Sequence, residues 1–186
     1  MVRKAFQPIL NRWLNRKFNI IKPYLPESGS ILDLGSGNCL LTDKLEKEGL
    51  AVTPVDVKDL SVVEHISPML YDGAQLPFDC KSFRSTLLLT VLHHTEEPEL
   101  VIHEAKRVTN ELVIVEDTYN NRFQKWMTQT LDFIVNMGHS KMTYMNKSEN
   151  EWEALFARNG LNISGKQTSR VLFFFQQTTY HLSVNE

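Results

Sequence analysis

Apolar residues along the chain follow two patterns, helical spacing and short continuous runs, and these patterns alternate. In residues 1–26 the apolar side chains recur three and four positions apart, which predicts an amphipathic helix. Pro23 and Pro26 end this helix, because proline lacks the backbone donor that a helix needs. From Ser30 onward, continuous apolar runs such as SILDLG are typical of strands buried in a parallel sheet.

Strands and helices are predicted in alternation through most of the chain. Predicted strands cover residues 30–35, 51–57, 66–73, 86–90 and 111–117, with two more after Leu161 that the segment RVLFFFQQ joins. Predicted helices cover residues 38–48, 98–108, 121–137 and 149–159. Pro68 places the third strand at an edge of the sheet. Between Asp56 and Ile66 there is room for about two helical turns at most.

This order of elements predicts an α/β fold. We expect one mostly parallel sheet with helices on both faces and an antiparallel C-terminal strand. The N-terminal helix, residues 1–26, is expected to form a cap or lid on a domain that spans residues 27–186. Within that domain, residues 119–147 are expected to form an insert on the substrate side.

Composition narrows the class of protein without naming it. The chain has 186 residues, 23% charged and 42% hydrophobic, as in an ordinary globular domain. Two cysteines give no disulfide framework and no metal-binding spacing, so a reduced, cytoplasmic location is expected and no metal site is predicted. No apolar run is long enough to span a membrane. No basic stripe accompanies the candidate site, which disfavours a nucleic-acid partner, and the oligomeric state stays unknown.

Charge is uneven near the N-terminus. Residues 1–26 carry six basic residues and no acidic one. Such a helix either packs on the domain with its basic face in water, or lids a substrate pocket, or rests weakly on an anionic membrane surface. The third alternative depends on Arg12, Arg16 and Lys17 facing outward.

The segment ILDLGSGNCL, residues 31–40, carries the first chemical signal. An acid ends an apolar strand, and a glycine loop leads into a helix. A simple tight turn is one interpretation of Gly35 and Gly37. A dinucleotide site is another, but its GxGxxG pattern fails at Leu40. The phosphate-binding loop GxxxxGK[ST] is also absent.

This segment resembles the first motif of class I S-adenosylmethionine-dependent methyltransferases, an acid followed by spaced glycines. Asp33, Gly35 and Gly37 match the motif, and Cys39 stands in place of its last glycine. The resemblance implies a single Rossmann-like three-layer sandwich, with residues 27–186 as the methyltransferase domain. It also implies S-adenosyl-L-methionine as cofactor, bound in part by the loop Gly35–Ser36–Gly37 with Asp33 near its ammonium group.

Further segments match the same family in the expected order. Asp56, followed by Val57, ends the second strand where the family binds the ribose hydroxyls, and a carboxylate offers acceptors to both. In YDGAQLPF, the resemblance implies that Asp72 accepts from the adenine amino group, while Gly73 and Ala74 lie along the ring. The remaining implied cofactor residues are Leu89 and Thr90.

The segment LLLTVLHHTEEPE contains those two residues and resembles the ubiquinone/menaquinone-biosynthesis type of methyltransferase. The chain also departs from the family. It has VTNEL where a Lys-Pro-Gly-Gly turn is common, and Arg84 stands where an acid is common. A catalytically silent protein that binds the cofactor and acts through a partner is therefore the alternative to an enzyme.

Candidate catalytic residues follow the fourth and fifth strands, at the sheet edge where open α/β folds bind ligands. His94 and His93 are candidates for accepting a proton, although either is equally interpretable as structural. Glu116, Asp117 and Tyr119 end the fifth strand, where one of the three is expected to bound the acceptor pocket, or else Asp117 or Asn120 caps the next helix.

The methyl acceptor is expected to be a small apolar or aromatic molecule. Residues 119–147 are rich in aromatic residues and methionine, and they follow the fifth strand, from which they can cover such a molecule. Side chains of this kind also build ordinary cores, so that alternative stays open.

Overall fold

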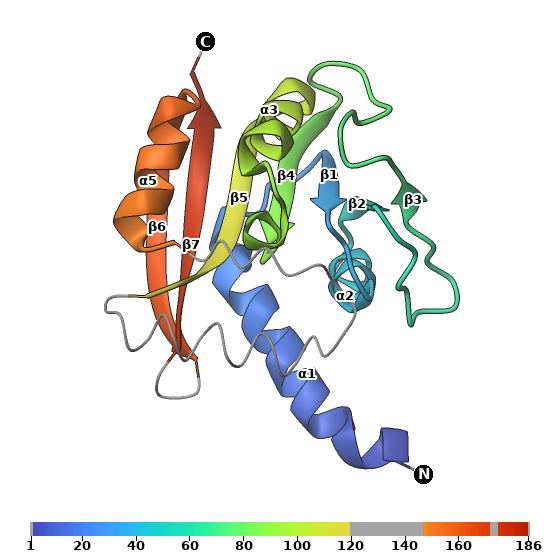
Figure 1. Ribbon diagram of the computed structural model, residues 1–186. Helices are drawn as coiled ribbons and strands as arrows, with labels where there is room; N and C mark the ends of the chain where they lie inside the picture. Colours follow the sequence, from blue (N-terminus) through green and yellow to red (C-terminus); the bar gives the residue numbers. More distant parts are fainter. Residues whose placement is uncertain (1, 120–146, 172–174, 186) are drawn as a thin grey trace.

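A seven-stranded sheet forms the centre of the molecule in the computed structural model (Figure 1). The structure describes residues 2–119, 147–171 and 175–185. The strand order is β3-β2-β1-β4-β5-β7-β6. The strands are β1 (Ser30–Leu34), β2 (Ala51–Asp56), β3 (Met69–Leu70), β4 (Phe83–Leu89), β5 (Thr109–Thr118), β6 (Leu161–Val171) and β7 (Phe175–Val184).

Strand directions confirm the predicted sheet. Strands β1 to β5 pair in parallel, whereas β7 pairs antiparallel with both β5 and β6. The predicted third strand is much shorter than the interval 66–73, because only Met69 and Leu70 pair with β2. No helix joins β2 to β3, as the short interval predicts.

Four helices and two 3-10 helices complete the described part of the chain. The helices are α1 (Val2–Ile21), α2 (Leu40–Lys47), α3 (Pro98–Val108) and α5 (Glu149–Arg158), and the 3-10 helices are Lys22–Tyr24 and Leu92–His94. Helix α5 begins at a capping box, in which Ser148 and Glu151 each accept from the other's backbone N–H. The predicted helix over 121–137 and most of the insert 119–147 lie outside the described residues.

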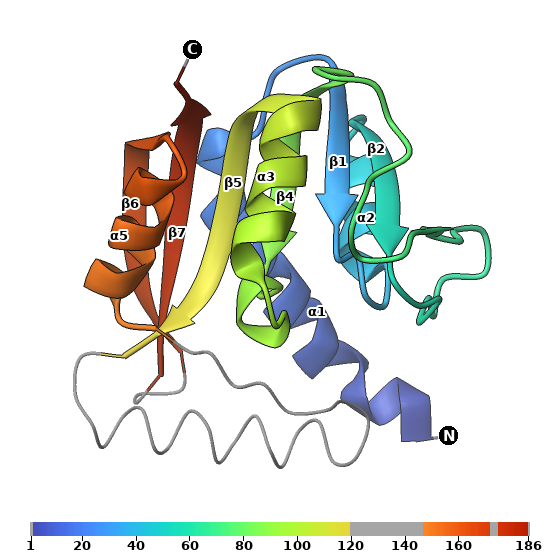
Figure 2. The ribbon, with the colours of Figure 1, turned by 45° about the horizontal axis from the view of Figure 1, so that its top comes forward.

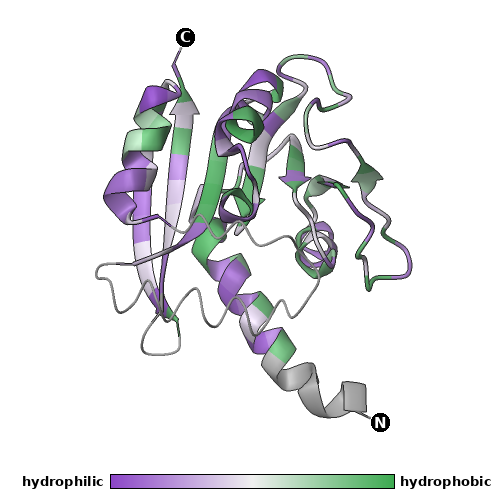
Figure 3. Ribbon diagram, viewed as in Figure 1, coloured by the Kyte–Doolittle hydropathy of each residue, from purple (hydrophilic) through white to green (hydrophobic). Residues whose placement is uncertain are grey.

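Alternate residues of the central strands face two different hydrophobic cores. Leu32 and Leu88 pack in a core with α3 and α5, while Ile31 and Leu87 pack in a core with α1 and α2. This period of two is the pattern of strands covered on both faces. Figure 2 shows α3 and α5 on one side of the sheet and α1 on the other. In Figure 3, β5 is coloured hydrophobic through its middle, as expected for a central strand.

The C-terminal half of α1 is part of the domain. Phe18, Ile20 and Ile21 are buried in the core that α2 shares. Arg16 donates to the side chains of Gln177 on β7 (3.0 Å) and Ser169 on β6 (2.8 Å). The packing interpretation of residues 1–26 therefore holds for this half, where Arg16 faces the sheet. No helix in the described ranges has the length and apolarity needed to cross a membrane.

The carboxyl ends of the parallel strands meet at one edge of the sheet. Figure 2 shows the arrowheads of β1, β2 and β5 pointing to the same end of the molecule. The chain leaves β1 and β4, which are neighbours, toward opposite faces, because α2 and α3 pack on different sides. Open α/β sheets bind ligands at such a switch point.

Candidate functional site

The loop after β1 packs directly on two neighbouring segments. The backbone N–H groups of Gly35 and Ser36 both donate to the carbonyl oxygen of Val55, at 2.8 and 3.1 Å. Gly35 has φ +81°, and a Cβ at this position would lie 2.5 Å from Cγ2 of Val91. Glycine is therefore required at position 35 both by backbone conformation and by the close approach of the segment after β4.

Gly37 links this loop to the end of β2. Its N–H donates to Oδ2 of Asp56 at 2.8 Å. Gly37 has φ +54°, but a Cβ there would meet no atom within 4 Å. The space beside Gly37 is open, so this part of the loop can lie against a ligand.

Cys39 adopts a backbone conformation that usually belongs to glycine. Its φ is +57°, in the left-handed region, and it precedes the first residue of α2. The side chain is fully buried, with Sγ 3.7 Å from Oγ of Ser36. The position of the family's last glycine thus keeps its glycine conformation here, at a cost of about 1–2 kcal/mol for a residue with a Cβ.

Asp33 is a buried acid beneath this loop. Its side chain is almost completely inaccessible, and Oδ2 accepts from Oγ1 of Thr42 in α2 at 2.7 Å. Burial raises the pKa of Asp33 from 3.8 to about 6, although the bond from Thr42 and the charge of Lys17 oppose the increase. Asp33 is therefore a buried acid beneath the loop whose charge is poorly solvated.

Asp56 closes the site at the end of β2. Oδ1 accepts from the N–H groups of Val57 (2.7 Å) and Lys58 (3.2 Å), while Oδ2 accepts from Gly37. A carboxylate has about four acceptor positions, so these bonds leave about one of them. The bonds fix the carboxylate beside the glycine loop.

The segment after β3 faces Asp56 and Val57. The N–H of Tyr71 donates to the carbonyl oxygen of Asp56 at 3.1 Å, and a Cβ on Gly73 would lie 3.5 Å from Cγ1 of Val57. Asp72 is exposed, and its Oδ1 accepts from the N–H groups of Ala74 and Gln75. These two bonds lower the pKa of Asp72 below its usual value.

Thr90, directly after β4, is conformationally strained. Its φ is +61°, which is unusual for a β-branched residue and costs about 1–3 kcal/mol. The N–H of Thr90 donates to the carbonyl oxygen of Val115 at 2.7 Å, which continues the pairing of Leu89 with Val115. Leu89 itself is buried in the core shared with α1. Strain of this kind is common at functional sites.

The two candidate histidines occupy different environments. His93 is buried, and its Nδ1 lies 2.5 Å from Oε2 of Glu116. His94 is exposed, and its ring lies 3.9 Å from the ring of His93. The geometry suits His93 to a structural role and leaves His94 accessible to a molecule from solution.

Of the three residues proposed to bound the acceptor pocket, Glu116 is excluded, because its carboxylate is completely buried. Oε1 accepts from the N–H groups of Val91 (3.1 Å) and Leu92 (2.8 Å), while Oε2 pairs with His93. The capping role expected for Asp117 is also wrong, because Asp117 lies within β5 and accepts from Nε2 of Gln177 at 2.9 Å.

Lys17 of α1 is a site residue that the sequence pattern does not single out. Nζ lies 3.5 Å from Oγ1 of Thr90 and 4.3 Å from the centre of the Trp13 ring. The amphipathic pattern of residues 1–26 suggests a solvated basic face, but here Lys17 faces the sheet. A signal for its role was available only from the fold, because 73 residues separate Lys17 from Thr90.

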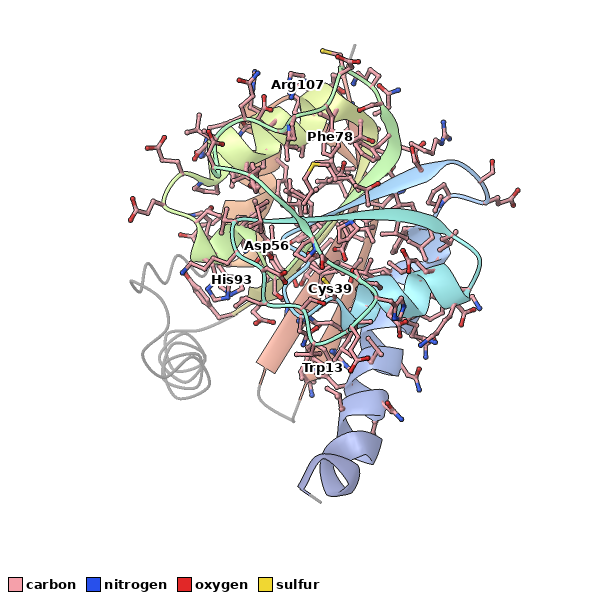
Figure 4. The ribbon with its side chains drawn as sticks, turned by 90° about the vertical axis from the view of Figure 1, so that its right-hand side faces the viewer. Trp13, Cys39, Asp56, Phe78, His93 and Arg107 are labelled. Atoms are coloured by element: carbon pink, nitrogen blue, oxygen red, sulfur yellow. The ribbon has the colours of Figure 1, made fainter. Side chains whose placement is uncertain are left out.

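The structure therefore brings most of the predicted cofactor residues to one edge. Gly35, Gly37, Asp56 and the segment 72–74 are joined by the contacts above. In Figure 4, Trp13, Cys39, Asp56 and His93 lie in one part of the view, whereas Phe78 and Arg107 lie at the opposite end. Within the described residues, no cluster of three or more His, Cys, Asp or Glu could hold a metal ion.

Comparison with known proteins supports the class that the motifs predict. Residues 32–112 match the family model described as a methyltransferase domain. No curated protein matches the chain.

Solved structures share the fold at low sequence identity. An S-adenosylmethionine-dependent methyltransferase from Methanosarcina mazei is 18% identical, with TM-score 0.69 over 90% of this chain and 98% of that one. Geranyl diphosphate C-methyltransferase from Streptomyces coelicolor A3(2), solved with S-adenosyl-L-homocysteine, is 13% identical, with TM-score 0.74 over 98% and 83%. A chain from a complex of the Haloferax volcanii Trm112 methyltransferase activator with a methyltransferase is 15% identical, with TM-score 0.71 over 100% and 99%.

The chain has the Rossmann-like fold of these methyltransferases, and its residues 32–112 match a methyltransferase domain, which supports S-adenosyl-L-methionine as the cofactor. The residues fit that cofactor, because the glycine loop has open space at Gly37 directly beside the carboxylate of Asp56. The narrower resemblance to the ubiquinone/menaquinone type stays a prediction.

The strain at Cys39 leads to a first prediction. We expect Cys39→Gly to bind S-adenosyl-L-homocysteine as tightly as wild type or more tightly, because glycine keeps the left-handed conformation without its cost. Cys39→Ala is the matched control, since it also removes the sulfur but retains the strain. By chemical denaturation, we expect the glycine variant to be more stable than the alanine variant by about 1 kcal/mol. A large loss of affinity confined to the glycine variant would contradict this account of the loop.

The raised pKa of Asp33 predicts a pH-dependent change in stability. Since the native pKa is about 6 and the ordinary value is 3.8, the wild type loses stability as pH rises through this interval. Asp33→Asn removes the buried charge but keeps an acceptor for Thr42. We expect it to match wild type below about pH 4 and to exceed it above about pH 6 by about 1–3 kcal/mol of unfolding free energy, while binding the cofactor more weakly. Urea denaturation across this range tests the expectation, and equal stabilities at high pH would refute it.

Glu116 predicts a large structural effect. Glu116→Ala leaves the N–H groups of Val91 and Leu92 and the ring of His93 without their acceptor, which should cost about 3–5 kcal/mol. Glu116→Gln keeps an oxygen for the two N–H groups, so a smaller loss, about 1–2 kcal/mol, is expected. Denaturation curves of both variants measure this order. A loss of unfolding free energy below about 1 kcal/mol for the alanine variant would show that the hydrogen bonds to Glu116 contribute little to stability.

Proposed function

We propose that the protein transfers a methyl group from S-adenosyl-L-methionine to a small apolar or aromatic acceptor, at oxygen, carbon or nitrogen. The observation that carries this proposal is the bond from Gly37 N–H to Asp56, because it joins the glycine loop after β1 to the acid after β2. In this proposal the protein acts in the cytoplasm on a small molecule.

In this proposal the predicted cofactor-binding residues contact separate parts of S-adenosyl-L-methionine. Asp56 accepts from the ribose hydroxyls. Because its carboxylate has about one acceptor position left, binding both hydroxyls requires one of the three backbone N–H groups to give up its bond to Asp56. Asp72, with Gly73 and Ala74, takes the adenine, and Gly73 already lies against Val57.

The remaining cofactor residues take the methionine part. Asp33 receives the ammonium group, and the loop Gly35–Ser36–Gly37 follows the backbone of the methionine moiety. Leu89 and Thr90 lie nearest to the sulfur. The strained φ of Thr90 supports a functional position at this point.

The protein's own contribution to catalysis is placement and proton removal. The cofactor supplies an activated methyl group that is transferred in an in-line displacement. The chain must hold the acceptor atom about 3 Å from that group and exclude competing orientations. His94 is exposed at the ligand edge and is the proposed proton acceptor, while His93 holds the same turn through Glu116.

Two measurements test this function in order. Calorimetry with S-adenosyl-L-methionine and S-adenosyl-L-homocysteine is expected to show binding that Asp56→Ala weakens by about 10-fold or more. Turnover is then measured against quinols, phenols and fatty acids, where His94→Gln is expected to lower kcat with a smaller effect on cofactor affinity. Failure of folded wild type to bind either cofactor form would overturn the proposal.

A second candidate is a catalytically silent cofactor-binding protein that acts through a partner. Leu60, Val62, Met69 and Leu70 are large apolar residues exposed at the β3 edge, where the β2–β3 connection has no helix. The similar Haloferax volcanii chain was solved in complex with an activator. Cofactor binding without turnover on any acceptor, in the absence of a partner, would favour this candidate.

A further inference from the structure

Helix α1 places one lysine over the carboxyl ends of the central strands. Nζ of Lys17 lies 3.5 Å from the hydroxyl of the strained Thr90 and 4.3 Å from the centre of the Trp13 ring. Trp13 remains 41% exposed, so the lysine is covered on one side by an aromatic ring at the molecular surface. Trp13 lies in the same part of Figure 4 as Cys39 and Asp56.

The position of Lys17 is fixed by the residue before it. Arg16 donates to Gln177 at 3.0 Å and to Ser169 at 2.8 Å, and Gln177 in turn donates to Asp117 at 2.9 Å. These bonds tie α1 to β6, β7 and β5. Lys17 is therefore held by its backbone as part of the site.

The ammonium group of Lys17 lies beside the hydroxyl of Thr90 and forms no ion pair with a carboxylate among the described residues. Burial lowers the pKa of Lys17, while the charges of Asp117, Asp33 and Glu116 act in the opposite direction. Within residues 2–119, 147–171 and 175–185, no carboxylate lies within 4.0 Å of Nζ. A half-buried lysine at the carboxyl ends of the strands, with no anionic partner among the described residues, is a candidate for binding an anionic ligand.

Each neighbouring carboxylate already has its own donors. Glu116 accepts from Val91, Leu92 and His93, and Asp117 accepts from Gln177. Asp33 accepts from Thr42 of α2. A carboxylate from outside the protein can therefore approach Lys17 without displacing a bond within the protein to those acids.

We propose that Lys17 binds the carboxylate group of a ligand over the end of β4. The inference rests on the proposed function and extends it to a residue outside the family motifs. Lys17 reaches the end of β4 from α1, where its Nζ lies 3.5 Å from the hydroxyl of Thr90. An ammonium group at this place is complementary to a carboxylate, including the carboxylate of an α-amino acid group. The carboxylate of the cofactor fits this description, and that of an acidic methyl acceptor has the same chemistry.

Calorimetry with two ligands tests whether the carboxylate that Lys17 binds belongs to the cofactor. S-adenosyl-L-homocysteine carries the amino acid group, whereas 5′-methylthioadenosine lacks it. We expect Lys17→Gln to weaken binding of S-adenosyl-L-homocysteine by about 10- to 100-fold and to leave the affinity for 5′-methylthioadenosine within about 2-fold of wild type. Lys17→Arg should lose less, because it keeps the charge. Lys22→Gln is the matched control, since Lys22 is an exposed lysine five residues further on, and it should bind both ligands as wild type does.

A second titration tests whether the carboxylate that Lys17 binds belongs to the methyl acceptor. With the protein saturated with S-adenosyl-L-homocysteine, benzoate and benzamide are titrated as a charged and an uncharged probe of the same shape. If Lys17→Gln leaves S-adenosyl-L-homocysteine affinity unchanged but removes a preference for benzoate over benzamide, the carboxylate comes from the acceptor. Either source supports an anion-binding Lys17.

The outcomes that overturn the inference are separate from those that overturn the function. If wild type binds S-adenosyl-L-homocysteine and Lys17→Gln matches it in both titrations, Lys17 binds no carboxylate and the methyltransferase function stands. Equal weakening of S-adenosyl-L-homocysteine and 5′-methylthioadenosine would show a structural role and also refute the inference. Thermal unfolding controls for folding, and removal of a desolvated ammonium is expected to leave Tm unchanged or higher.

Discussion

The buried carboxylate of Glu116 fixes the geometry on which the candidate site depends. It has no exposure to solvent, and it accepts from Val91, Leu92 and His93, so the segment after β4 has one position relative to β5. Val91 in turn lies against Gly35, where no Cβ fits. The glycine loop after β1 is thereby placed by an acid on β5, although β4 lies between these strands. Such a buried pair is costly to form but strongly specifies one arrangement.

The same edge carries several charged groups that are poorly solvated. Burial raises the pKa of Asp33 and of Asp117 and lowers that of Lys17. The strained backbone at Cys39 and Thr90 adds to the free-energy cost of folding this edge. The two hydrophobic cores on either face of the sheet offset these terms, because their members are almost completely buried. These buried charges and strained residues gather at one edge of the sheet. Such a grouping is expected of a site that is retained for ligand binding rather than for stability.

Much of the fold was accessible from sequence because its signals are local. The capping box at Ser148, the continuous apolar runs of β4 and β5 and the glycine loop each depend on residues close together in the chain. The positions of Asp33 and Asp56 near strand ends followed from runs of the same kind. The burial of Glu116 and its pairing with His93 could not be derived, because 23 residues separate the two and only the register of β4 and β5 brings them together. The bond between Asp33 and Thr42 likewise depends on packing, because α2 must lie against the sheet beside β1.

The N-terminal helix shows why charge pattern alone was insufficient. In the sequence, Arg12, Arg16 and Lys17 are equivalent basic residues of an amphipathic helix, and association with an anionic membrane would use all three. In the fold, Arg16 donates to Gln177 and Ser169, and Lys17 reaches Thr90, so Arg12 is the member of this set that faces solvent. The helix directs its basic residues toward the strand ends because Phe18, Ile20 and Ile21 anchor it in the core. Apolar spacing determined which face of the helix is buried, and the polar residues at the border of that face became part of the site.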